Sequence, residues 1–458
     1  MSAIRSGQAG GWSLRVVWFA ALGVLAAVPP VAWAFGGFRQ AVGGIYIDAG
    51  GAVSNAQKDQ LGDLRKERLK ALRPVPGDLN QPAKLRKVSL RLLDEAIGEC
   101  LRRDQPLPDE IKCLGGLQRI QYVFVYPEQN DIVLAGYGEG WQVDPRGNLV
   151  GITTGRPVLQ LDDLLVALRT AREASRGGIS CSIDPTKEGL ARLQAALPSL
   201  FALGPNPRLA AEKMERELGP QIVSFTGVPT FSHFARVLLA ADFRMKRIAM
   251  HFDPSPVKGL PDYLHMLKGG KNAAMQNVLP RWWLTTDYDP LLTDGEGLAW
   301  ELRGRGVKAM SEDDFVDAQG NRTQTGKASP LAQKWADLMT AKYDELSVKE
   351  PIFGELRNCM DLAVVAALID KENLAAKAGL NMGRLLNADD LPIEEFLTPK
   401  QIDTKASFIE TRDNYIISAS GGVAINSWGA ADHKETSDKL APVRAAAAES
   451  RAKSWWWN

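Results

Sequence analysis

The sequence contains little of the side-chain chemistry on which most hydrolases depend. It has four histidines and four cysteines in 458 residues, and no Gly-x-Ser-x-Gly elbow. The nearest approach to a phosphate-binding loop, Gly320–Lys327, has five residues between its glycines where four are required, and Ala328 replaces the Ser or Thr. Gly136–Gly140 precedes a predicted strand, whereas a dinucleotide-binding turn requires a helix there. We therefore predict no cofactor and no metal.

The chain also lacks a basic excess. The first 34 residues contain two arginines and no acid, so the remainder carries 53 Lys and Arg against 54 Asp and Glu. Duplex nucleic acid is bound by concentrated positive surfaces, and we predict no nucleic-acid partner. Lys58–Arg103 is a local exception, with 12 basic and 7 acidic residues. A solvated helix face explains this segment, and contact with an anionic envelope polymer or lipid head group is the alternative.

An uncharged apolar run lies near the N-terminus. Arg5 and Arg15 precede Val16–Val28, and Ala32-Trp33-Ala34 supplies the small residues that signal peptidase requires. A transmembrane anchor is the alternative, but this run is shorter than the roughly 20 residues that span a bilayer. We predict a signal peptide over residues 1–34, cleavage near Ala34, and a periplasmic or secreted protein that meets the membrane only during export.

The four cysteines form one predicted pair and two single positions. Cys100 lies on the apolar stripe of a predicted helix, and two prolines turn the chain before Cys113. A disulfide between Cys100 and Cys113 would close a loop of about 14 residues and stabilise the fold by on the order of 3 kcal/mol. Two buried free thiols are the alternative. Cys359 resembles a core residue on another helical stripe, Cys181 lies in a predicted strand, and the sequence leaves their pairing open.

A four-residue unit with Asp or Asn first and Gly fourth recurs along the chain. In a type I turn the first side chain accepts a backbone N–H bond and Gly fits the fourth position. Strand-like segments precede most of these units, which therefore predict hairpins. Calcium binding is the alternative, but the alternating ligands and closing Glu of a calcium loop are missing. The units are Asp48–Gly51, Asp144–Gly147, Asp294–Gly297, Asp317–Gly320 and Asn426–Gly429.

Between these units the hydrophobic period changes between two and 3.6. We expect an α+β fold in which a mixed sheet with several β-hairpins is covered by helices, plus a C-terminal helical subdomain. Asp184-Pro185 is expected to start a helix. The predicted strands include 119–126, 131–135, 179–183, 221–226 and 246–252, and the predicted helices include 161–174 and those that begin at Ser329-Pro330 and at Pro351.

These patterns divide the chain into five predicted parts. They are a signal peptide at 1–34, an N-terminal hairpin and basic segment at 35–80, a mixed α/β core at 81–327, a helical subdomain at 328–405, and C-terminal strands, an Ala-rich helix and a tryptophan tail at 406–458.

The closest approach to an active site is a proline-punctuated segment that holds two histidines. His251 and Asp253, at strand spacing i and i+2, would share one face and could flank a metal or form an acid/base pair, with His265 nearby. These three residues are the candidate catalytic groups. Capping and loop hydrogen bonding are the alternative.

Tryptophans supply the candidate ligand-stacking residues. Alternation along a strand would aim one ring of Trp282-Trp283 at the core and the other outward, where it could stack on a sugar or a partner. Packing beneath the helices is the alternative. Trp455-Trp456-Trp457 ends the chain, and exposed tryptophan is unfavourable. We expect this triplet to dock on its own domain, on a partner or at a membrane interface, and the sequence does not decide among them.

Four further segments have distinctive amino-acid sequences. They are Gly43–Asp48 (GGIYID), Gly155–Leu164 (GRPVLQLDDL), Ala240–Lys246 (AADFRMK) and Arg281–Trp283 (RWW). Together they resemble a family of exported planctomycete proteins that carries only the label of domain of unknown function 1598. The resemblance implies export and a shared fold, and it supplies no catalytic residue.

The expected function is interaction with an envelope or matrix polymer, or with a protein partner, without catalysis. An extracytoplasmic hydrolase with a dispersed site near His251, Asp253 and His265 is one alternative. A polysaccharide-binding protein that uses Trp282 or Trp283 is the other.

Overall fold

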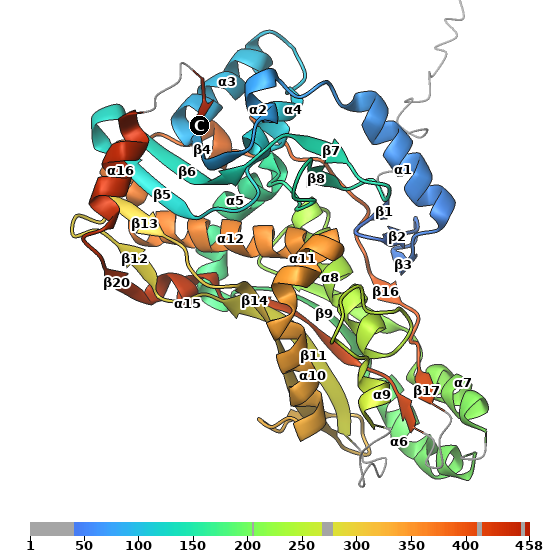
Figure 1. Cartoon of the computed structure of the whole chain (residues 1–458). Helices are drawn as coiled ribbons and strands as arrows, with labels where there is room; N and C mark the ends of the chain where they lie inside the picture. The colour runs from blue at the N-terminus through green and yellow to red at the C-terminus, as the bar shows by residue number, and fades with distance from the viewer. Residues whose placement is uncertain (1–40, 204–205, 268–277, 410–414, 450–453) are drawn as a thin grey trace, which may run out of the picture. The chain divides into compact units, whose positions relative to one another are not determined.

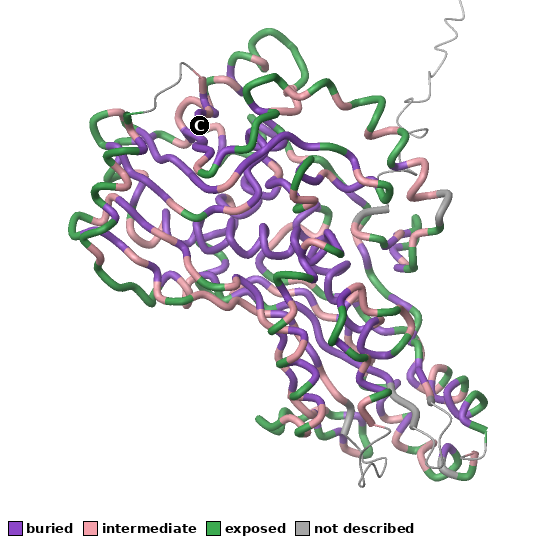
Figure 2. The backbone as a smooth tube through the Cα atoms, viewed as in Figure 1, coloured by how far each residue is buried: buried purple, intermediate pink, exposed green. Residues whose placement is uncertain are grey.

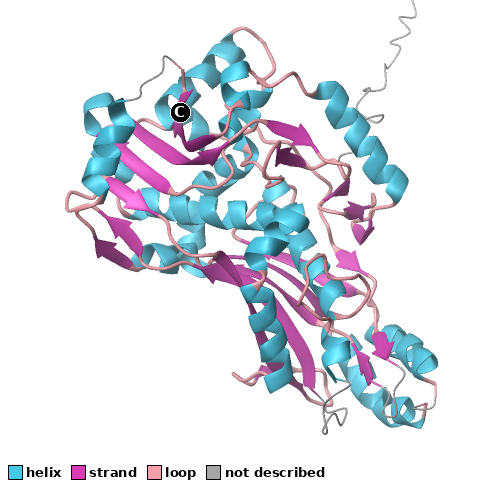
Figure 3. Cartoon of the chain, in the orientation of Figure 1, coloured by secondary structure: helices cyan, strands magenta, loops and turns pink. Residues whose placement is uncertain are grey.

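The computed structural model describes residues 41–203, 206–267, 278–409, 415–449 and 454–458. Helices and strands are mixed along these residues, and Gly37–Asn458 is one compact unit (Figures 1 and 3). The expected α+β class, with mixed sheets, hairpins and covering helices, is confirmed. The predicted signal peptide lies outside the described residues.

Among the described residues, the larger sheet has ten strands in the order β1-β2-β3-β16-β10-β9-β19-β11-β14-β15. Neighbouring strands are antiparallel except for the pairs β3–β16 and β11–β19. Strand β19, from the C-terminal part of the chain, lies inside the sheet between β9 and β11. The ten strands are β1 (Ala41–Val42), β2 (Ile45–Ile47), β3 (Ala52–Asn55), β9 (Ile179–Pro185), β10 (Gln221–Thr226), β11 (Val278–Asp287), β14 (Gly306–Val316), β15 (Arg322–Gln324), β16 (Gln401–Ile402) and β19 (Ser420–Ile425).

A second sheet has seven described strands in the order β20-β12-β13-β5-β6-β4-β21, with only β12 and β20 parallel. The strands predicted at 119–126 and 131–135 are confirmed as β5 and β6, which form an antiparallel hairpin across Pro127–Asn130. The strands are β4 (Ala83–Ser89), β5 (Tyr122–Tyr126), β6 (Asp131–Gly138), β12 (Leu291–Thr293), β13 (Ala299–Glu301), β20 (Lys434–Thr436) and β21 (Trp456–Trp457), and two separate pairs are β7 (Trp141–Val143) with β8 (Leu149–Gly151) and β17 (Ser407–Ile409) with β18 (Tyr415–Ile417).

Helix α12 (Pro351–Lys371) is the centre of the core. It is apolar on nearly every side, so it is stable only when covered all round. Almost all of its residues are buried against α5, α8, α11 and α15, as the purple tube shows in Figure 2. Its side chains join one apolar cluster that includes residues from both sheets. The predicted helical segment at 328–405 therefore shares its core with the rest of the compact unit Gly37–Asn458.

The remaining helices cover the sheets or connect their strands. None of the described helices combines the length and apolar character needed to cross a membrane. They are α1 (Lys58–Ala71), α2 (Gly77–Asn80), α3 (Leu90–Arg102), α4 (Asp109–Lys112), α5 (Leu161–Gly177), α6 (Lys187–Ala202), α7 (Pro207–Leu218), α8 (His233–Ala249), α9 (Tyr263–Leu267), α10 (Pro330–Ala341), α11 (Tyr343–Lys349), α13 (Leu374–Ala378), α14 (Gly383–Leu386), α15 (Ser427–Asp432) and α16 (Leu440–Glu449).

Four of the five Asp/Asn-to-Gly units form the predicted hairpin turns. In each, the fourth-position glycine has a positive φ and donates its N–H to the carbonyl of the first residue. The Asp side chain also accepts backbone N–H bonds from residues further along the turn. The fifth unit is not a hairpin: Asn426 caps α15 by accepting the N–H of Gly429 at 2.9 Å.

A predicted strand and a predicted helix start are wrong. No strand forms at 246–252, because Met245, Ile248 and Ala249 continue the apolar face of α8. Asp184-Pro185 does not open a helix, since β9 continues through Pro185. Thr186 instead accepts the N–H of Gly189 at 3.0 Å at the start of α6.

All four cysteines are free thiols, so the predicted Cys100–Cys113 disulfide is absent. The two side chains belong to different packing environments. Cys113 is buried with Leu79 and Trp141, whereas Cys100 packs from α3 against the main core cluster. Cys181 and Cys359 are also buried as single thiols.

The C-terminal tryptophans dock on their own domain. β21 extends the seven-stranded sheet by pairing with β4, and Trp455 and Trp457 are buried. The Trp457 indole N–H donates to the carbonyl of Ala447 in α16 at 3.4 Å. The structure thus decides among the three alternatives that the sequence left open.

Candidate functional site

Helix α8 positions most of the candidate functional residues. Ser232 caps its first turn by accepting the N–H of Ala235 at 3.1 Å. The helix packs against α5 and α12 on one side and against β9 and β19 on another, so nearly all of it is buried. Three features lie along it. They are an ion pair at its N-terminus, a cavity beside its C-terminal half, and a histidine cluster just beyond its end.

The N-terminal group is a buried ion pair between His233 and Asp163. The His233 Nδ1 lies 3.0 and 3.1 Å from the two carboxylate oxygens of Asp163. Burial opposes a charge on this imidazole, but the attraction and hydrogen bonding of Asp163 outweigh it and raise the pKa of His233 to about 9. No local sequence pattern joins these residues, because they are 70 positions apart.

Glu355 and Cys359 lie on α12 near this pair. Burial raises the pKa of the Glu355 carboxyl, and the charge of His233 lowers it in part. Burial, with the charges of Asp163 and Glu355, raises the pKa of the Cys359 thiol. A thiol nucleophile requires a lowered pKa and access to a substrate. Cys359 has neither, so its thiol does not meet these requirements.

The cavity has a volume of about 200 Å³ and lies where the C-terminal half of α8 meets β3, β9, β10 and β16. Its lining combines apolar side chains with three cations, Lys246, Arg247 and Lys405, and with the acid Asp403. The complete lining is Val53, Ser54, Asn55, Ile183, Gln221, Phe243, Lys246, Arg247, Met250, Phe252, Ile402, Asp403, Lys405 and Ala419.

Lys246 is held rigidly in the cavity wall. Its Nζ donates to Asp242 at 2.8 Å and to the carbonyls of Ile183 and Gly421 at 3.4 and 3.3 Å. Burial raises the pKa of Asp242 to about 6, although the neighbouring Lys246 opposes the shift. Asp242 is not part of the lining, so Lys246 is the member of this pair that lines the cavity.

Arg247 is fixed in a similar way by Asp253. Two parallel hydrogen bonds of 2.8 and 2.9 Å join the guanidinium to the carboxylate, and Arg244 binds the same carboxylate. Partial burial opposes the charge on Asp253, but the two arginines outweigh it and lower its pKa. The predicted pairing of Asp253 with His251 is therefore wrong, because Asp253 is the anion of an arginine cluster.

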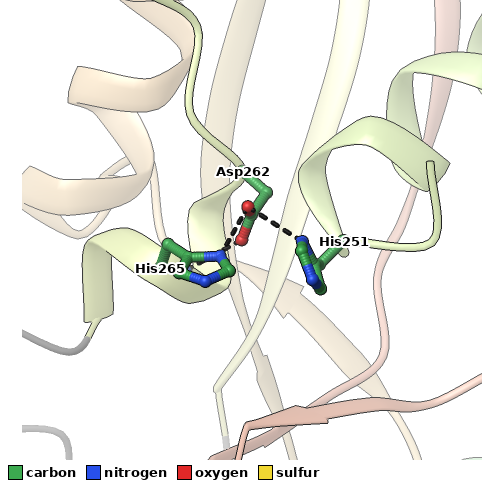
Figure 4. A group of neighbouring side chains, drawn as sticks. All are labelled: His251, Asp262 and His265. Atoms are coloured by element: carbon green, nitrogen blue, oxygen red, sulfur yellow. Dashed lines mark hydrogen bonds and ion pairs between the residues drawn. The ribbon is translucent and has the colours of Figure 1, made fainter. Parts of the chain in front are cut away.

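The histidine cluster contains two predicted residues and one that the sequence did not indicate (Figure 4). His251 Nδ1 lies 3.0 Å and His265 Nδ1 2.6 Å from the same oxygen of Asp262. The imidazoles are about half exposed, whereas Asp262 is largely covered. His251 and His265 are thus brought together, with Asp262 in the place predicted for Asp253.

Local structure explains this arrangement. Asp262 precedes α9, and its second oxygen accepts the backbone N–H of His265 at 2.8 Å. One carboxylate oxygen therefore caps the helix while the other faces both rings. His251 follows α8 and has a φ of 61°, an uncommon conformation for a residue other than glycine. The Asp-x-x-His spacing was the sequence signal that could have identified Asp262.

Trp282 and Trp283 alternate as predicted. Trp282 is fully buried between Tyr263 and Trp335, with ring centroids at 5.0 and 5.3 Å, so it cannot stack on a ligand. Trp283 is partly exposed, and the guanidinium of Arg281 lies 5.2 Å from its ring. Only Trp283 remains a candidate for stacking.

Fold and site define a mixed α+β protein with a cavity of about 200 Å³ beside a buried helix. Residues 181–263 match the model of a family described as "Protein of unknown function (DUF1598)". The label of domain of unknown function 1598 is thus confirmed over this segment, which runs from β9 to the first residue of α9 and includes seven of the fourteen lining residues. Comparisons with curated proteins and with solved structures gave no match.

Proposed function

We propose that this is an exported, non-catalytic binding protein whose cavity beside α8 holds a small ligand with an apolar body and an anionic group. The observation that carries the proposal is the composition of the cavity wall. Phe243, Met250 and Phe252 offer apolar surface, while Lys246 and Arg247 place two fixed cations beside it. Small-molecule sites commonly combine an apolar lining with a few well-placed polar groups.

The rigidity of these cations favours binding. Lys246 and Arg247 are already oriented by Asp242 and Asp253, so a ligand need not order them. The exposed Lys405 adds a third positive group. The lining itself has three cations and the acid Asp403, a balance that favours an anion over a cation. The acids that pair with these cations, Asp242, Asp253 and Glu215, lie outside the lining.

The chemistry around the cavity supports binding rather than hydrolysis. Asp253 is occupied by two arginines, and the buried Cys359 is inaccessible to substrate. Export rests on the apolar run and small residues of the first 34 positions, and it agrees with the resemblance to exported planctomycete proteins. The ligand would then be an envelope or matrix component, or part of one.

Ligand binding is tested with the fluorescent anion 8-anilinonaphthalene-1-sulfonate. We expect octanoate to displace this anion and octylamine, which has the same chain length and the opposite charge, to displace it poorly. Lys405→Glu should weaken binding about tenfold or more, and Ser54→Trp should obstruct the cavity. Lys439→Glu is the matched control, because this exposed lysine lies outside the lining.

Equal displacement by octanoate and octylamine would refute the preference for anions. Probe binding that survives in both cavity variants would remove the cavity as the site. Export is tested separately by mass spectrometry of the chain recovered from its producing cell. A chain that begins at Phe35 agrees with cleavage, whereas one that retains Met1 in the membrane contradicts it.

A further inference from the structure

We infer that His251, Asp262 and His265 form a binding site for a first-row transition-metal dication, with Zn²⁺ as the simplest occupant. The site is distinct from the cavity, since none of the three residues belongs to its lining. One ligand atom from each residue lies within 4.8 Å of the other two. Two imidazole nitrogens and one carboxylate oxygen suit zinc and its neighbours better than calcium or magnesium, which prefer oxygen ligands.

The present hydrogen-bond geometry is close to the geometry of metal coordination. Ligand atoms in a tetrahedral zinc site lie about 3.3 Å apart, given zinc–nitrogen and zinc–oxygen bonds of about 2.0–2.2 Å. The Asp262 oxygen lies 3.0 and 2.6 Å from the two Nδ1 atoms. To admit the ion, the His251 contact needs to lengthen by about 0.3 Å and the His265 contact by about 0.7 Å. Coordination through Nδ1 requires that this nitrogen carry no proton. An imidazole meets this requirement in the tautomer that carries its proton on Nε2.

The backbone prepares the carboxylate for this role. The second oxygen of Asp262 is fixed by the N–H of His265, so the oxygen that faces the rings is oriented before a metal arrives. Both rings are partly exposed, which leaves an entry path and room for water as a further ligand. The bound ion would tie the end of α8 to the start of α9.

The test is zinc titration of the purified protein without a polyhistidine tag, followed by calorimetry and elemental analysis. We expect one Zn²⁺ per chain. His251→Ala and His265→Ala should each weaken binding about 100-fold or more, because each removes a direct ligand. His433→Ala is the matched control: this histidine is exposed, and its ring interacts with a backbone carbonyl outside the cluster. The control should bind zinc as the wild type does.

Substitution with Co²⁺ distinguishes this site from metal capture by cysteine. The near-ultraviolet spectrum of the bound ion should lack thiolate-to-cobalt charge-transfer absorption, because all four thiols lie outside the cluster. Unfolding in urea checks that the histidine variants are folded. The inference is overturned if the wild type takes up no zinc, if both histidine variants bind like the control, or if the spectrum shows thiolate ligation.

Discussion

The two ends of α8 carry the same hydrogen bond in different surroundings. His233 is the first residue of α8, and its Nδ1 lies 3.0 Å from a carboxylate oxygen of Asp163. His251 lies just beyond the last turn, and its Nδ1 is 3.0 Å from a carboxylate oxygen of Asp262. The His233 side chain is 4% exposed, whereas that of His251 is 54% exposed. Distance alone therefore does not distinguish the two pairs.

Burial determines what each pair contributes. At the inner end, water cannot screen the charges, and the attraction of Asp163 overcomes the cost of burying a charged imidazole. At the outer end, solvent screens the contact, which makes the pair weak and its groups available to a ligand. The inner pair should therefore stabilise the fold, whereas the outer cluster can change partners without unfolding the protein.

Asp163→Asn should have the largest effect. The substitution preserves size but leaves His233 without its counter-ion, and breaking a buried ion pair costs about 3–5 kcal/mol. Urea unfolding followed by tryptophan fluorescence at pH 7 measures the loss. Val166→Ala, on the same helix α5, is a control for a purely apolar loss of about 1–3 kcal/mol. A loss below about 1 kcal/mol for Asp163→Asn would contradict a stabilising charged pair.

The stabilising effect of His233 should disappear at high pH. The folded-state pKa of about 9 lies above the ordinary value of about 6.5, so the contribution is fully present below pH 6.5 and is lost as pH rises through 9. The difference in unfolding free energy between wild type and Asp163→Asn should therefore shrink by about 2–3 kcal/mol from pH 7 to pH 10. Other groups that titrate in this range largely cancel in that difference. A constant difference would show that His233 is neutral in the folded protein.

Local patterns in the sequence predicted much of the fold. Hydrophobic period identified α5, β5, β6 and β10, and turn chemistry identified the four hairpins that begin with Asp. The errors occurred where one local signal has two outcomes. Asn426 can start a turn or cap a helix, and residues 246–252 combine a helix end with an irregular loop. The position of α12 in the common core depends on tertiary packing, and the local hydrophobic period of the sequence does not predict it.

The candidate site was predicted less completely. The segment around His251 and His265 was correct as a location, but the partner acid was Asp262 instead of Asp253. Spacing of i and i+2 implies a shared face only in a strand, and these residues follow a helix. The cavity was missed because its walls come from β3, α8 and β16, which are far apart in the sequence. Only the folded structure shows that these three elements lie together.

Asp262→Asn should have the smallest effect on stability and is the matched counterpart of Asp163→Asn. Asparagine caps a helix about as well as aspartate, and exposed ion pairs are worth only about 0–1 kcal/mol. We therefore expect a loss below about 1 kcal/mol in urea unfolding, measured with a chelator present so that bound metal adds no stability. Zinc affinity should fall in the same variant, because the amide lacks the carboxylate charge. A stability loss equal to that of Asp163→Asn would mean that the outer cluster holds the fold together in the same way as the inner pair, and the contrast between the two ends of α8 would fail.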